Sequence, residues 1–295
     1  MAEAKGGRPA FMAAEETLAM CPGLPSGSDT ANTRTDLLDG IKRRIGSEIE
    51  PPAFDILREA PSCLDDLLVA LSPLIDSCRI QSAAEKLRDE ADRMTRGEVH
   101  FRDHLDWLIH SGHSREDSRQ IRYLVEAFYH LEPVFAIIAA VAHGWIMGSP
   151  RDRAARSADC RSVAVNFPGP FAFAAEGATV GVLGRVSSRR PPGLFLRGLA
   201  MWPGYARGVQ IDLPAEARQA CARSSTELCC RSLELAGPLA AATAPRSWRA
   251  CPERGRALNE CVRASCNAIP VICALRRGFI EDEMRQRADA RAHGR

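Results

Sequence analysis

The sequence predicts an all-α fold built from two tandem helical repeats that pair as a pseudo-dimer. Apolar residues recur at helical spacing through most of the chain, as in the stripe from Leu64 to Leu71, whereas strand-type alternation never persists beyond a few residues. The chain also repeats itself: the turn-and-helix pattern at Pro61 returns at Pro203, and the pattern around Pro133 returns at Pro270. Two landmarks that recur in the same order at intervals of 142 and 137 residues indicate a duplicated unit of roughly 140 residues.

The first half begins after a leader. Residues 1–33 are rich in Gly, Ala, Pro and Ser without a sustained period, which is typical of a flexible segment. The first repeat, 34–147, follows, and Ser114 with Asp117 predicts the start of its last helix, which Pro133 should kink. The other apolar stripes predict helices around 37–45, 64–71 and 83–94.

The second half begins after a linker. Residues 148–193 are rich in Arg, Ser, Gly and Pro, which favours a connection between the halves. In the second repeat, 194–292, we expect helices at about 194–211, 214–236, 255–268 and 270–290. If the halves pair, a ligand site is expected between them, because pockets favour such interfaces.

Composition narrows the class of protein without naming its function. The chain has 295 residues, is 45% hydrophobic and 26% charged, and carries a net charge of +2, so no global field attracts nucleic acid or membrane. The spacing of its eleven cysteines fits no zinc template and favours a reducing compartment. The longest apolar run, Val134 to Ala142, is too short to cross a bilayer. We therefore expect a soluble cytoplasmic protein without a cofactor. The sequence is compatible with either a monomer or a homodimer.

Three segments invite comparison with a known family. The stretches LRGLAMWPGY from Leu196, VGVLGRV from Val180 and IRYLVEAFYHLEPVFAIIAAVAHG from Ile121 resemble the group I 2-haloacid dehalogenases, which act on both D- and L-substrates. The likeness runs from about residue 37 to 288. It implies an all-helical pseudo-dimer with a buried site between the repeats. There, water activated by one aspartate would displace halide from a small 2-halocarboxylate without a covalent intermediate.

The chain departs from that family at the catalytic position. Without gaps, the family's aspartate aligns with Phe195, and a phenyl ring cannot accept a proton from water. General-base assistance is worth about two to four powers of ten in rate, so we expect no dehalogenation by the family's route. Other site positions also differ, since an asparagine aligns with Glu132, a tyrosine with Phe135, and two aromatic wall residues with Ile49 and Pro52.

Glu132 is the one substitution that introduces a titratable group into the expected site. In a cavity lined by Phe54, Phe135, Phe195 and Trp202, a glutamate would lose hydration and its pKa would rise toward neutrality. Such a group could act as a general acid or base, and His130 is a second candidate for that cavity. The alternative is a partly exposed glutamate at a helix kink, or one paired with an arginine.

A histidine cluster raises the question of a metal. Six of the seven histidines lie between His100 and His143, and His100 with His104 has the spacing of two ligands on one helix face. No further ligand stands at a defined distance, so we expect solvated helix faces and no metal site.

Three functions follow from these observations. The first is a small-molecule enzyme on the dehalogenase scaffold that acts on an organic acid or carbonyl compound, as in specialised (secondary) metabolite biosynthesis, with Glu132 as acid or base. The second is a hydrolytic dehalogenase in which Asp55 or Glu132 replaces the missing aspartate. The third is a catalytically silent protein that binds a ligand or partner. We favour the first.

Overall fold

The computed structural model describes residues 30–58, 60–99, 108–109, 112–147, 194–199, 201–202, 204–205, 215–244 and 251–293. Within these ranges the chain is helical with no strand, so the all-α prediction is confirmed. The helices are α1 Thr30–Ile45, α2 Pro52–Arg58, α3 Pro61–Asp76, α4 Arg79–Thr95, α6 Arg115–Ile146, α9 Leu194–Leu199, α11 Ala215–Thr243 and α12 Pro252–His293. The predicted linker at 148–193 lies outside the described residues, as does the leader up to residue 29. Helix α1 begins at Thr30, slightly before the expected end of that leader.

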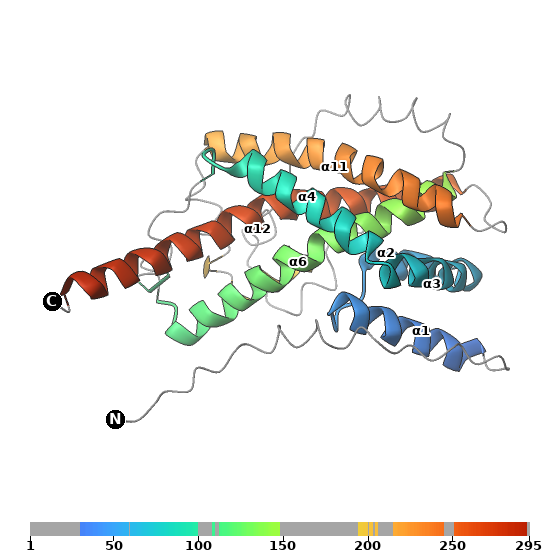
Figure 1. Ribbon diagram of the computed structural model, residues 1–295, viewed down its shortest axis with the longest axis horizontal. Helices are drawn as coiled ribbons and strands as arrows, with labels where there is room; N and C mark the ends of the chain where they lie inside the picture. Colours follow the sequence, from blue (N-terminus) through green and yellow to red (C-terminus); the bar gives the residue numbers. More distant parts are fainter. Residues whose placement is uncertain are drawn as a thin grey trace.

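Helices α6 and α12 form an antiparallel pair at the centre of the molecule (Figure 1). Arg122 contacts Glu283 near the start of α6, and Gly255 lies against Met147 beyond its end. Helix α4 packs against both members of the pair and against α11, which also packs on both. These four helices enclose the main core.

Helix α6 begins where the sequence predicts. The Ser114 hydroxyl accepts a hydrogen bond from the Asp117 N–H at 3.0 Å, and the Asp117 carboxylate accepts one from the Ser114 N–H at 2.9 Å. This capping box satisfies two of the N–H groups that a helix start leaves unpaired.

The predicted interruption before Pro270 is wrong, because α12 is one continuous helix from Pro252 to His293. Proline removes one backbone hydrogen bond. Here, however, the residues from Ala268 to Leu275 are buried, and their packing keeps the helix intact on both sides of the proline. Pro133 likewise lies inside α6 without ending it.

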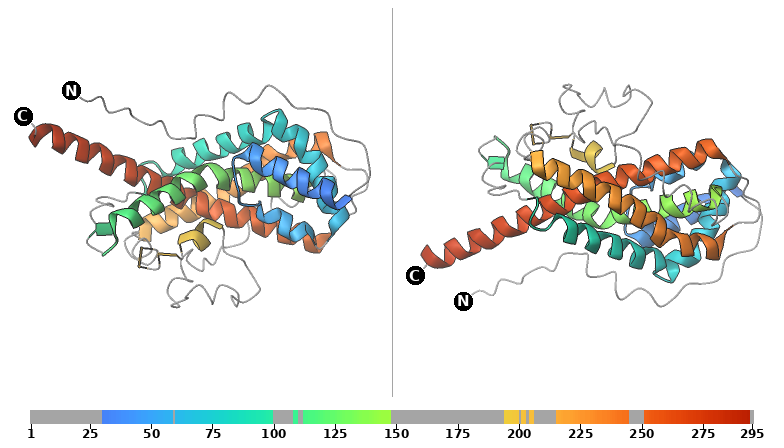
Figure 2. Two further views of the ribbon diagram at one scale, coloured as in Figure 1. Left: turned by 90° about the horizontal axis from the view of Figure 1, so that it is seen from below. Right: turned by 90° about the horizontal axis from the view of Figure 1, so that it is seen from above.

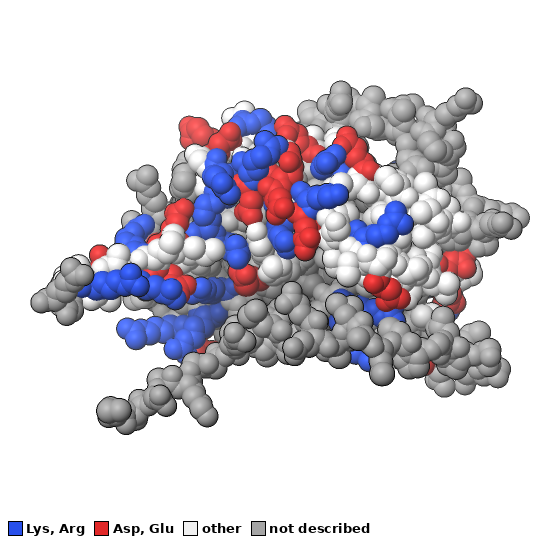
Figure 3. Space-filling model, viewed as in Figure 1, with Lys and Arg blue, Asp and Glu red and all other residues white. Residues whose placement is uncertain are grey.

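Helices α1, α2 and α3 gather at one end of the bundle, where α1 packs against α3 and α2 contacts both central helices. At the other end, the last turns of α12 extend beyond the body (Figure 2). The side chains from Met284 to His293 are accordingly exposed. On the face seen in Figure 3, basic and acidic side chains mix over α4 and α12, while the surface nearer α2 and α3 is largely uncharged.

Helix α6 is long and apolar enough to cross a membrane by length and composition alone. In the structure, 78% of its most apolar window is buried inside the protein. A core helix of a soluble protein passes the same test, so this feature is weak evidence for a membrane span.

Candidate functional site

Glu132 lies where α6, α9 and α12 meet. Its side chain is buried, with 1% of the residue exposed. The Phe195 N–H on α9 donates to Glu132 Oε1 at 3.2 Å, and the buried Ser265 hydroxyl on α12 is a second donor to the carboxyl group. One acid thus connects three helices, and no cationic side chain of the described residues pairs with it.

The environment of Glu132 favours its protonated form. Burial is the largest cause, because the anion loses its hydration, while the bonds from Ser265 and Phe195 act in the opposite direction. The net effect raises the pKa of Glu132 from 4.5 to about 7. The group can therefore both take up and release a proton near neutral pH, as a general acid or base requires.

Several of the aromatic residues expected near Glu132 are buried. The Phe195 ring packs against Phe128 with 5.8 Å between centroids and a tilt of 59°. Phe135, one helical turn beyond Glu132, is buried, as is Phe54 on α2. The structure therefore brings the backbone of Phe195 to Glu132, while the Phe195 ring packs on Phe128.

The remaining sequence candidates lie elsewhere. His130 is half exposed on another face of α6, with Nδ1 3.0 Å from an Arg88 nitrogen and Nε2 3.6 Å from Glu126 Oε1, so it does not meet Glu132. Trp202 is partly buried and donates through Nε1 to Asp117 Oδ1 at 3.2 Å.

The expected wall at the start of α2 is less enclosed than the sequence suggests. Ile49 is 40% exposed and Pro52 is only partly buried. Asp55, the candidate replacement base, is exposed and forms an ion pair with Arg58 at 2.8 Å. Asp55 therefore lies at the surface, outside the buried junction that holds Glu132.

Sequence reasoning missed a polar cluster around Tyr129, one helical turn before Glu132 on α6. The ring of Tyr129 lies between two guanidinium groups, with the Arg276 carbon 4.1 Å and the Arg88 carbon 5.1 Å from its centroid. Its hydroxyl donates to Asp92, and burial with this bond raises the pKa of Tyr129 well above its usual value. Helices α4, α6 and α12 supply these residues, so no local spacing could have revealed the cluster.

No group of His, Cys, Asp and Glu able to hold a metal ion occurs among the residues that the structure describes. His100, His104 and His110 of the predicted histidine cluster lie outside those residues.

Comparisons with protein-family models, with curated proteins and with solved structures each gave no match.

Proposed function

We propose that the chain is an intramolecular pair of duplicated helical units related by a two-fold axis between α6 and α12. The register of this pair supports the proposal. Contacts of Glu126 with Arg276 and of Met147 with Gly255 place Pro133 and Pro270 at nearly the same level of the antiparallel pair. A residue on a two-fold axis faces its own equivalent, and these prolines are the equivalents that the repeat of 137 residues predicts.

The short helices α2 and α9 support the same symmetry. Each precedes one of the repeated X-Pro turns, and each contacts both central helices. At the interval of 142 residues, Ala53 corresponds to Phe195 and Leu57 to Leu199, and all four are buried. Helices α4 and α11 likewise flank the pair as equivalents.

Glu132 breaks this symmetry, and we infer that it is the acid-base centre of a small-molecule enzyme. Its equivalent in the second unit is Ile269, which is buried and has no proton to exchange. The observation that carries the inference is a fully buried carboxyl group that has two neutral donors, no cationic partner among the described residues and a pKa of about 7. Acidic residues whose pKa values are strongly shifted are more frequent at functional sites than elsewhere in proteins.

In the proposed reaction, the carboxylate of Glu132 takes a proton from an acidic C–H or O–H group of a small organic acid or carbonyl compound and later returns it. The Phe195 N–H and the Ser265 hydroxyl stabilise the ionised form of Glu132, and burial favours its protonated form. Because these effects oppose each other, the carboxyl group can change between the two forms. A substrate reaches this carboxyl group only if a neighbouring element moves. Helix α9 is suited to move, since a helix of six residues has little stability of its own.

The relation to the group I 2-haloacid dehalogenases remains a proposal based on sequence resemblance and on the two-fold arrangement. In the alignment that this resemblance implies, Phe195 stands at the position of that family's base. The backbone N–H of Phe195 donates to Glu132. We therefore propose that the chain uses a scaffold of that kind for chemistry other than halide release. A hydrolytic dehalogenase with Glu132 as the relocated base is the alternative.

Solvent-exchange measurements test the proposal. The protein is incubated in D₂O with a panel of small keto acids, hydroxy acids and ketones, and deuterium incorporation is followed by NMR. Halide release from 2-chloropropionate is measured in parallel. We expect exchange into at least one carbonyl compound, a loss of about two to four powers of ten in Glu132→Gln, and no halide. Asp282→Asn, which changes another buried acid, is the matched control and should retain exchange.

One observation favours a second function, that of a catalytically silent ligand-binding or interaction protein. The carboxyl group of Glu132 accepts hydrogen bonds from Phe195 and Ser265, and these bonds would hold α9 in place even if the group never exchanged a proton. Exchange that is absent, or equal in the wild type and Glu132→Gln, would support this function and overturn the acid-base proposal. Halide release that depends on Glu132 would instead support the relocated base.

A further inference from the structure

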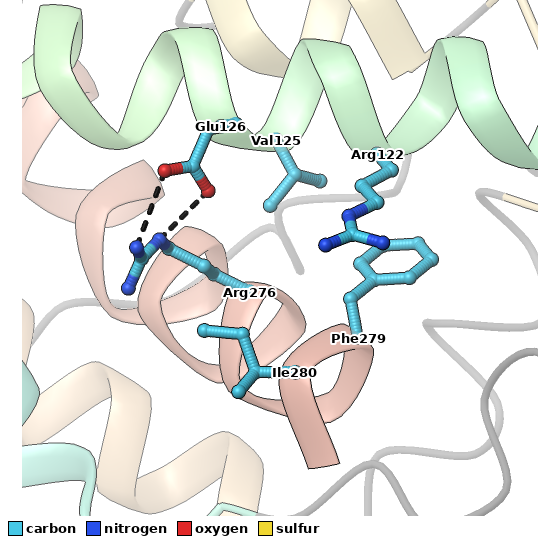
Figure 4. Close-up of a pocket in the computed structure, with 6 residues that line it drawn as sticks. All are labelled: Arg122, Val125, Glu126, Arg276, Phe279 and Ile280. Atoms are coloured by element: carbon cyan, nitrogen blue, oxygen red, sulfur yellow. Dashed lines mark hydrogen bonds and ion pairs between the residues drawn. The ribbon is translucent and has the colours of Figure 1, made fainter. Parts of the chain in front are cut away.

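A hollow of about 180 Å³ opens between α6 and α12, away from Glu132 (Figure 4). Its apolar lining consists of Val125, Phe279 and Ile280. Arg122 and Arg276 also line it, and in Figure 4 the guanidinium of Arg122 extends beside the Phe279 ring. A water molecule occupies about 30 Å³ in the liquid, so the hollow has the volume of about six waters, or of one small organic molecule.

The charges around the hollow do not cancel. Glu283 is shared between Arg122 and Arg287, with both contacts at 2.5 Å, and Glu126 pairs with Arg276 at 2.8 Å. The bond from His130 and the contacts of Arg276 lower the pKa of Glu126 to about 2, and the two arginines lower that of Glu283. Both carboxylates are therefore ionised at neutral pH. The charged groups that line the hollow itself are two guanidinium groups, Arg122 and Arg276, and one carboxylate, Glu126. The excess charge is positive.

The two lining arginines retain donors from which no described residue accepts a hydrogen bond. Arg122 bonds to Glu283 through Nη2, and its Nε and Nη1 groups donate to no atom of the described residues. Arg276 is held rigidly by two bonds to Glu126 and by the ring of Tyr129, and its Nη1 is likewise unused. A guanidinium holds a planar anion through two adjacent N–H groups, and Arg122 offers such a pair in the second N–H of Nη2 with the neighbouring N–H of Nη1 or Nε.

We propose that this hollow binds a small aromatic carboxylate. The carboxylate group accepts from Arg122, and the flat ring lies on Val125, Phe279 and Ile280 with Arg276 at its edge. The apolar lining selects a hydrophobic body, while the unused donors and the excess positive charge select an anion. The site is separate from Glu132 and does not depend on the acid-base proposal.

Binding of benzoate to the purified full chain tests the proposal, with isothermal titration for affinity and the side-chain Nε–H signals of ¹⁵N-labelled arginine for location. Benzyl alcohol keeps the ring without the charge, and acetate keeps the charge without the ring. We expect benzoate to saturate with a dissociation constant of about 1 mM or tighter and to bind at least about ten-fold more tightly than either. The Arg122 signal should shift on binding.

Substitutions then locate the site. Arg122→Gln should weaken benzoate binding at least about ten-fold, and Arg122→Lys should give an intermediate loss because it keeps the charge but not the planar fork. Arg231→Gln, which changes an exposed arginine paired with Glu234 on α11, should leave binding unchanged, as should Glu132→Gln. A cooperative thermal unfolding transition in each variant shows that it is folded. Lack of saturable benzoate binding, or equal binding by the wild type and Arg122→Gln, would overturn the proposal.

Discussion

Replacing Glu132 with glutamine should stabilise the protein at alkaline pH and not at acidic pH. Glutamine has nearly the same shape, and its carbonyl oxygen can still accept from the Phe195 N–H and the Ser265 hydroxyl. Its amide carries no charge, so the variant never bears the cost of a buried anion. The two proteins should therefore differ only where Glu132 is ionised.

The magnitude follows from the raised pKa of Glu132. Below pH 4.5 the carboxyl is protonated in both the folded and the unfolded chain, and its contribution to stability is complete. As the pH rises toward 7, the unfolded chain ionises first, and this contribution is lost. A pKa raised from 4.5 to about 7, at about 1.4 kcal/mol per unit, gives a loss of about 3 kcal/mol above pH 7.

Chemical denaturation of the wild type and Glu132→Gln between pH 4.5 and 8.5 measures this effect. The difference between the two proteins cancels the titration of every other group. We expect similar free energies of unfolding at pH 4.5 and an advantage for the variant of about 3 kcal/mol at pH 8, or about 5–10 °C in Tm. An advantage that does not change with pH, or a variant that is less stable throughout, would refute the reasoning.

Two further substitutions test the surroundings of this junction. Ser265→Ala removes a donor that favours the anion, so the pKa of Glu132 should rise further, and in the same denaturation series the loss of stability should continue to a higher pH and become larger. Gly198→Ala would place a Cβ 3.0 Å from the Leu124 side chain and should cost about 1 kcal/mol or more, whereas Gly40→Ala on α1 meets nothing within 4 Å and should be neutral or stabilising. Equal effects of the two alanines in thermal unfolding would contradict the close approach of α9 to α6.

Local sequence patterns explain the parts of the fold that were predicted correctly. The start of α6 depends on Ser114 and Asp117, which are three residues apart, and the helical class depends on apolar stripes within single helices. The boundary at Pro270 was predicted wrongly because the local rule for proline ignores packing. Contacts with neighbouring helices outweigh the lost hydrogen bond when both sides of the proline are buried.

The two sites differ in how far the sequence could reveal them. The repeat and the family resemblance drew attention to Glu132 and Phe195 together, and the structure places their atoms in contact. The hollow between α6 and α12 gave no such signal, because Glu126 and Arg276 are 150 residues apart and each looks like an ordinary charge on a helix surface. Only the antiparallel register of the two helices brings them together.

The central claim, that Glu132 is a buried acid poised near neutrality, can be measured directly. The ¹³C signal of its side-chain carboxyl, assigned by its absence in Glu132→Gln, is followed by NMR from pH 4 to 9 in the full chain. We predict a midpoint near pH 7, in agreement with a pKa of about 7. A midpoint near 4.5, the ordinary value for a glutamate, would show a hydrated carboxylate and contradict the account.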